Sequence, residues 1–105
     1  MEVYEKTQDF PWEELYGLTS QMRRSAISVC ANIAEGSGRG SLSDSIRFLF
    51  IAQGSLSELE YLLHIAHRLG YFSLEVYRHF ASFQSEAAKL LRGFIRAKQQ
   101  QQQSS

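Results

Sequence analysis

The spacing of apolar residues predicts helices along most of the chain. Between about residue 19 and Glu35, apolar positions recur at steps of three and four. These positions are Met22, Ala26, Val29, Cys30 and Ile33. The spacing places them on one face of an amphipathic helix, and we expect that face to be buried.

The next predicted helix starts at the capping sequence Ser41 to Asp44 and continues to Leu69. Its apolar positions have the spacing of a heptad seam: Leu49, Ala52, Leu56, Leu59, Leu63 and Ala66. Further apolar residues widen this surface: Phe48, Ile51, Leu62, Ile65 and Leu69. A helix that is apolar over so much of its girth is expected to contact neighbours on more than one side.

A last helix is predicted to start at the N-cap Ser73. It carries a second heptad row: Tyr77, Phe80, Gln84, Ala87, Leu91 and Phe94. Beside that row lie Val76, Phe83, Leu90 and Ile95. The run of glutamines and serines that follows is polar and of low complexity. We therefore predict a helical domain over residues 1–98 and a disordered tail over residues 99–105.

Ahead of these helices, residues 1–9 are predicted to form a short helical piece that ends at Phe10-Pro11. Tyr16-Gly17 is expected to break the turn that begins at Pro11, so that Thr19 or Ser20 caps the first long helix. The elements together predict an all-α fold, an up-down four-helix bundle with a shortened first helix. Such a bundle leaves an apolar stripe uncovered. Either the chain is a three-helix unit with a short cap, or another subunit of a homo-oligomer covers the stripe.

Composition agrees with a single domain of 105 residues, of which 44% are hydrophobic. No apolar run is long enough to span a membrane, no secretory leader is seen, and a lone cysteine fits a reducing cytoplasm. The formal net charge is zero, but acidic residues gather in residues 1–22 and basic residues in residues 78–98. A dedicated nucleic-acid binder is usually basic overall, which weakens that function for this chain.

Five stretches of the chain match, in the same order, the sequence pattern of a known protein family: Tyr16–Ala26, Ala31–Gly36, Ile46–Leu49, Gly54–Glu60 and Leu69–Tyr71. Over residues 3–96 the chain resembles the family of four-helix bundle proteins encoded by 23S ribosomal RNA intervening sequences. The resemblance implies an up-down bundle that assembles as a homopentamer and has no known catalytic activity. Family members usually carry further turns of the first helix before Val3-Tyr4, so this first helix is expected to be truncated.

That family resembles in turn the accessory protein of diversity-generating retroelements, which binds a reverse transcriptase and nucleic acid. The accessory protein is strongly basic, whereas this chain is neutral. An RNA-binding or reverse-transcriptase-associated role is therefore kept as an alternative to a scaffold or adaptor. In an oligomer its contacts would come from a ring of basic residues: Arg39, Arg47, Arg92, Arg96 and Lys98.

The candidate subunit or interhelix contacts are polar residues close to the predicted core: Arg23, Arg24, Asn32, Glu35, Arg47 and Glu58. Burying such groups without partners costs on the order of 1–3 kcal/mol. One hypothesis pairs Arg23 or Arg24 with Glu58 or Glu35, between helices or across a subunit boundary. The alternative is a solvated face whose ion pairs contribute little.

Other candidates for chemistry are weaker. Glu60, His64 and His67 share a helix face and could hold zinc, but no flanking motif supports a metal site. The glycines of residues 36–40 follow a helix rather than a strand, so we interpret them as a cap and turn and not as a phosphate loop. Cys30 is expected to be a small core residue. No nucleophile with its base is apparent, so we predict no enzyme, no cofactor and no small-molecule substrate.

Overall fold

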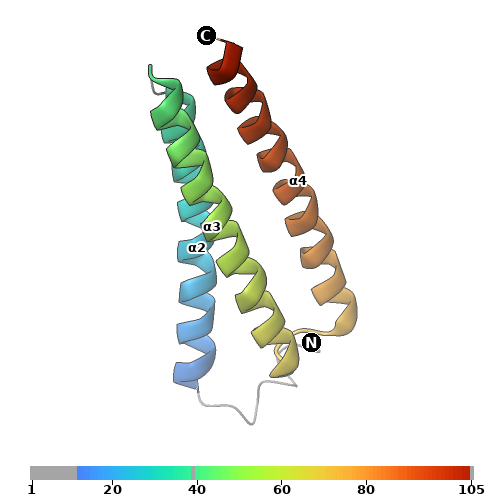
Figure 1. The fold of residues 1–105 in the computed structure, drawn as a ribbon. Coiled ribbons are helices and arrows are strands. Elements are labelled where there is room, and N and C mark those ends of the chain that lie inside the picture. Colours follow the sequence, from blue (N-terminus) through green and yellow to red (C-terminus); the bar gives the residue numbers. More distant parts are fainter. Residues whose placement is uncertain (1–11, 39, 105) are drawn as a thin grey trace.

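The computed structural model describes residues 12–38 and 40–104, and it is all-α over that part of the chain. Helices α2 (Trp12–Gly38), α3 (Leu42–Arg68) and α4 (Leu74–Ser104) run up, down and up (Figure 1). The described part therefore contains three helices, not the predicted four, and the predicted helical piece of residues 1–9 lies outside it. None of the described helices is long and apolar enough to cross a membrane.

The first described helix is longer at both ends than predicted. α2 passes through Tyr16-Gly17 without a break, because one glycine in a helix costs only about 1 kcal/mol. It also continues past Glu35 to Gly38. Gly36 is buried, and a Cβ there would lie 3.1 Å from the carbonyl oxygen of Ser45. This glycine thus allows α2 and α3 to approach closely and does not act as the predicted cap.

The predicted N-caps of α3 and α4 are confirmed, whereas the predicted cap at Thr19 or Ser20 is wrong, because both residues lie inside α2. The Ser41 hydroxyl accepts a hydrogen bond from the Asp44 amide at 3.2 Å, and the Ser73 hydroxyl accepts one from the Val76 amide at 3.1 Å. Between α3 and α4, Gly70 adopts a φ of 80°, a conformation that strains other residues. These features fix both ends of α3 and the start of α4 as the sequence indicated.

Aromatic residues on α3 and directly after it differ in their burial. Tyr71, directly after the turn, is only 1% exposed, and burial together with the nearby Glu14 carboxylate raises the pKa of its phenol. Phe72 is half-buried, whereas Tyr61 is 65% exposed on α3. The side chain of Trp12 lies outside the described part of the structure.

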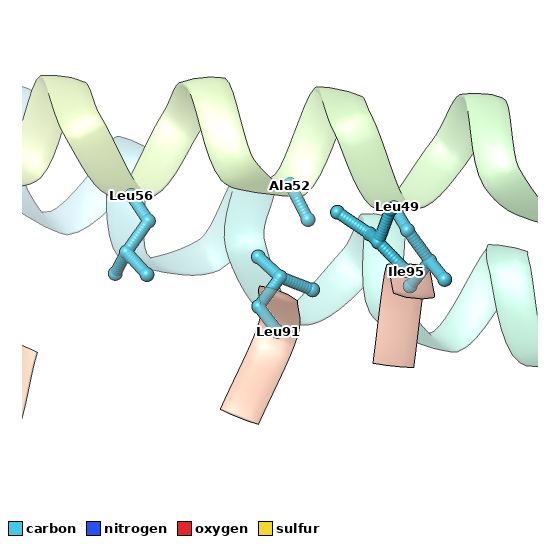
Figure 2. Close-up of a cluster of buried hydrophobic side chains, with 5 residues drawn as sticks. All are labelled: Leu49, Ala52, Leu56, Leu91 and Ile95. Carbon is cyan, nitrogen blue, oxygen red and sulfur yellow. The ribbon is translucent and has the colours of Figure 1, made fainter. Parts of the chain in front are cut away.

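The core lies along one face of α3. Figure 2 shows side chains of α3 pointing towards side chains of α4, and together they form a buried cluster: Leu49, Ala52, Leu56, Leu91 and Ile95. From α2, Val29 and Ile33 pack against this cluster but stay partly exposed. The predicted heptad seam of α3 is therefore correct, and α3 is the central helix that packs against both others.

The polar tail differs from the predicted disorder, because α4 continues to Ser104. Glutamine has a good intrinsic helix propensity, so a glutamine run can extend a helix that has already formed. The amide of Gln102 also donates a hydrogen bond to the Ser43 hydroxyl at 2.8 Å, which ties the end of α4 to the first turn of α3.

Candidate assembly interface

An apolar groove of about 590 Å³ lies between α2 and α4, with α3 as its floor. Its α2 wall contains the whole predicted apolar face: Met22, Ala26, Val29, Cys30 and Ile33. The floor is formed by Leu56, Leu59 and Leu63 of α3. We define these walls and floor, with Phe80, Phe83 and Ala87 of α4, as the α2–α4 groove.

Cys30 corrects one prediction. Its position on the apolar face of α2 is confirmed, yet the residue is exposed and is not the small core residue that was expected. The reason is that this face of α2 borders the α2–α4 groove, and no described segment fills the groove. The same reason leaves Ile33 and Val29 only partly buried.

The exposed side of α4 continues the apolar surface beyond the groove. Phe83 is 73% exposed, Leu90 is 65% exposed and Phe94 is 53% exposed. In the predicted heptad row, Gln84 and Leu91 do turn towards α3 and are buried. Leaving large apolar side chains in water forgoes about 25 cal/mol per Å² of burial, so contiguous patches of this kind commonly mark interaction sites.

Beside their apolar contacts, α2 and α3 share a closely fitted polar contact. The hydroxyls of Ser28 and Ser55 are 2.7 Å apart, one on each helix. The amide of Asn32 donates to the Ser28 carbonyl oxygen at 2.8 Å and to its hydroxyl at 3.1 Å. Ser25, one turn earlier, is buried. Asn32 thus acts within α2, where it supports the serine pair that joins the two helices.

The predicted charge pairs are placed as follows. Arg24 and Glu58 line one open pocket of about 430 Å³ between α2 and α3. Within residues 12–38 and 40–104, the structure records no ion pair between these two side chains. Arg23 instead lies at the wall of the α2–α4 groove, and Glu35 is exposed near the end of α2. The structure therefore brings Arg24 near Glu58 but separates Arg23 from it within one chain.

Arg47 has a local role on α3. Its Nε lies 3.8 Å from the Asp44 carboxylate, and its guanidinium lies 4.5 Å from the centre of the Phe48 ring. Both side chains of the ion pair are at least half exposed, so its contribution to stability is small.

The predicted basic ring is only partly assembled within the chain. Arg92 and Arg96 are exposed one turn apart, on the same face of α4. Lys98 is half-buried and lies two residues later, which places it on the other side of the helix. Arg47 belongs to α3, and Arg39 lies outside the described residues. The α4 face has two further cations, Arg78 and Lys89, which the candidate ring did not include.

The Glu60, His64 and His67 stripe holds α3 against α4. The Gln84 amide donates to the Glu60 carboxylate at 3.1 Å, and the Tyr77 hydroxyl lies 2.6 Å from Nδ1 of His64. The ring of His67 stacks on Tyr77 with 4.3 Å between ring centres. No group of three or more His, Cys, Asp or Glu in the described part of the chain could hold a metal ion. The sequence marked Tyr77 and Gln84 as seam residues but not as these hydrogen-bonding partners.

The three antiparallel helices and their open apolar groove define an all-α bundle protein whose prominent surface is a hydrophobic one. Residues 1–93 match the sequence profile of the family described as 23S rRNA-intervening sequence protein, and the chain belongs to this family. No curated protein matches the chain. The match confirms the resemblance found from the ordered sequence stretches.

Proposed function

We propose that the protein is a non-enzymatic subunit of a self-assembling helical scaffold or adaptor. The observation that carries this proposal is the α2–α4 groove, in which Phe83 is exposed, together with the exposed Leu90 beside it. Apolar area of this extent is stabilised when another helix covers it. The exposed thiol of Cys30 at the groove fits a reducing compartment such as the cytoplasm.

The polar residues support a structural role over a catalytic one. Glu60 is bound by Gln84, and the His64 ring by the Tyr77 hydroxyl, so these groups join two helices. Family resemblance puts the number of subunits at five, and a closed ring would give each subunit the same pair of contacts.

Native mass spectrometry and light scattering of the purified protein test this function. We expect one dominant oligomer, five-fold by resemblance, whose mass is unchanged over a tenfold dilution in the micromolar range. A monomer at every concentration would refute the scaffold proposal, because the apolar groove would then be stable in water without a partner subunit.

A second candidate function is nucleic-acid binding, favoured by the basic face of α4. Arg92 and Arg96 lie there with Arg78 and Lys89, and among the described residues no ion pair is recorded for them. Oligomerisation would repeat this face around the assembly and raise the local positive potential. The double variant Arg92→Gln/Arg96→Gln should then weaken binding of a single-stranded RNA oligonucleotide and reduce its salt dependence.

A matched control is Arg68→Gln, since Arg68 is equally exposed at the end of α3 but away from that face. Gel-shift titrations at several salt concentrations provide the measurement. Equal affinity for the double variant, the control and the unchanged protein would eliminate this second function.

A further inference from the structure

A second groove lies where α3 and α4 meet, apart from the α2–α4 groove. Two open pockets of about 330 Å³ and 220 Å³ run along this contact. They share four of their lining residues and so form one continuous groove: Glu60, Gln84, Ala88 and Arg92. We call it the α3–α4 groove. The buried seam of Leu56, Leu63 and Gln84 separates it from the α2–α4 groove, since these three residues border both.

The α4 wall of the α3–α4 groove is made of small side chains. Ala81, Ser85 and Ala88 follow one another at steps of four and three, which places them on one face of α4. On the α3 wall, Gln53 and Ser57 offer an amide and a hydroxyl. A flat ligand group can therefore approach the α4 backbone and form hydrogen bonds with the α3 wall.

Positive charge follows the α4 side of this groove. Arg92 borders both pockets, and three further cations are exposed on the same helix: Arg78, Lys89 and Arg96. At 3.6 residues per turn, the four side chains start within about 60° of one another around α4 and extend over about 27 Å. Among the described acidic residues only Glu60 borders the groove, and its carboxylate already accepts a hydrogen bond within the chain. The groove therefore suits an extended chain of negative charges more than a single anion.

Aromatic rings border both ends of the α3–α4 groove. Phe50 is 47% exposed at one end, and His64 and Tyr77 border the other end, with 5.3 Å between their ring centres. Phe50 and His64 are fourteen residues apart on α3, which corresponds to about 21 Å. Proteins that bind single strands combine a cationic groove with aromatic side chains on which bases stack. An acidic peptide would match the cations but would leave these ring faces without a stacking partner.

We propose that the α3–α4 groove binds single-stranded nucleic acid. Bases stack on Phe50 at one end and on the His64 and Tyr77 pair at the other, and the phosphates contact the cations of α4. This site rests on nucleic-acid binding, the second function proposed above, and it specifies where the strand lies. The length of the groove corresponds to about four to six nucleotides. A duplex does not fit, because its bases stack on one another and present no free face to the rings.

Strands with and without bases separate stacking from charge. The probes are a labelled oligouridylate of about eight nucleotides and an abasic strand of the same length, compared by fluorescence anisotropy. We expect the unchanged protein to bind the oligouridylate about tenfold or more tightly than the abasic strand. Phe50→Leu should weaken oligouridylate binding about five- to tenfold, because one base loses its stacking partner. Its affinity for the abasic strand should stay unchanged, which also shows that the variant is folded.

Phe94→Leu is the matched control. Phe94 is 53% exposed, close to the value for Phe50, and lies two residues after Arg92, about 160° around α4 from it. This variant should bind both strands as the unchanged protein does, with the same subunit number by native mass spectrometry. Equal losses for Phe50→Leu and Phe94→Leu would show that the loss is not specific to the groove, and the proposed site would be wrong.

A carboxylate placed inside the groove provides a second test. Ser85 is exposed on the α4 wall, so Ser85→Glu should leave the fold intact and weaken binding of both strands about tenfold or more by repelling the phosphates. Ala31→Glu makes the same change of charge on the exposed side of α2 and should have little effect. Similar losses for the two variants would place the strand outside the α3–α4 groove.

Two outcomes separate the site from the function on which it rests. If Arg92→Gln/Arg96→Gln weakens binding but both strands bind equally and Phe50→Leu has no effect, the protein binds a polyanion by charge alone. Nucleic-acid binding then stands, and the stacking site is wrong. If the unchanged protein binds neither strand at low salt, the site and the second function are both refuted.

Discussion

The two sides of α2 are built in opposite ways. Towards α3, the helix carries small and polar residues, with the Ser28 and Ser55 hydroxyls 2.7 Å apart and Gly36 against the backbone of Ser45. Towards α4, it carries Met22 and Ile33 on the wall of a groove of about 590 Å³. We call the side that faces α3 the closed side, because its polar groups are paired within the chain. We call the apolar side that faces the groove the open side.

The difference shows which contacts the chain completes by itself. The hydroxyls of Ser28 and Ser55 are partly buried, and their hydrogen bond needs a defined distance and angle, so the pair favours one register of α2 against α3. Apolar burial is non-directional and roughly proportional to area, so the groove can be completed by a separate subunit. We therefore expect the closed side to determine the stability of the monomer and the open side to determine assembly.

The largest expected difference in the free energy of unfolding is between alanine variants of two adjacent leucines on α4. Leu91 is 2% exposed in the core cluster, whereas Leu90 is 65% exposed. Leu91→Ala should lower the free energy of unfolding by about 2–5 kcal/mol, because it removes buried methyl groups and leaves a cavity. Leu90→Ala should cost less than about 0.5 kcal/mol in the monomer.

Urea unfolding at several protein concentrations measures both effects. For Leu91→Ala the loss should be the same at every concentration. For Leu90→Ala any loss should grow with concentration, because the side chain would be buried only in the assembly. Equal losses for both variants in dilute solution would show that Leu90 is part of the monomer core.

The next comparison tests the close approach of α2 and α3 by replacing a glycine at their contact and a glycine in open space. Gly36→Ala introduces a Cβ 3.1 Å from the Ser45 carbonyl oxygen, a backbone atom that cannot move aside alone. We expect a loss of about 1–3 kcal/mol, the usual cost of overpacking. Gly93→Ala meets nothing within 4 Å and should gain up to about 1 kcal/mol from helix propensity. Thermal denaturation of the two variants should shift in opposite directions, and parallel shifts would contradict the close packing at Gly36.

The sequence alone was sufficient to predict the central helix α3 and its buried face, but it was not sufficient to predict the α2–α4 groove. The seam of α3 was predicted residue by residue, because a heptad spacing defines one buried face whatever covers it. Phe83 and Leu90 were recognised only as apolar residues beside a seam. Whether such residues are core or interface depends on how many helices surround them, and periodicity carries no such count. Cys30 was misplaced for the same reason.

Two predictions were wrong because they rested on local composition alone. The glutamine run predicted disorder because its composition is polar and repetitive, yet helix propensity and the contact of Gln102 with Ser43 favour a continued helix. Gly36 looked like a cap from its neighbours in sequence. Its role depends instead on Ser45, which the fold brings alongside. The hydrogen bond between Ser28 and Ser55 could not be predicted from the sequence, because it depends on the register of α2 against α3.

That serine pair gives the smallest and most specific test of the closed side. Ser28→Ala and Ser55→Ala should each cost about 1 kcal/mol, because each leaves the other hydroxyl without its partner across the helices. The double variant should cost clearly less than the sum, since two methyl groups can pack where two hydroxyls met. A double-mutant cycle by urea unfolding gives the coupling energy directly. Strict additivity would mean that the two hydroxyls contribute separately, and the register of α2 on α3 would then rest on Gly36 and the apolar cluster alone.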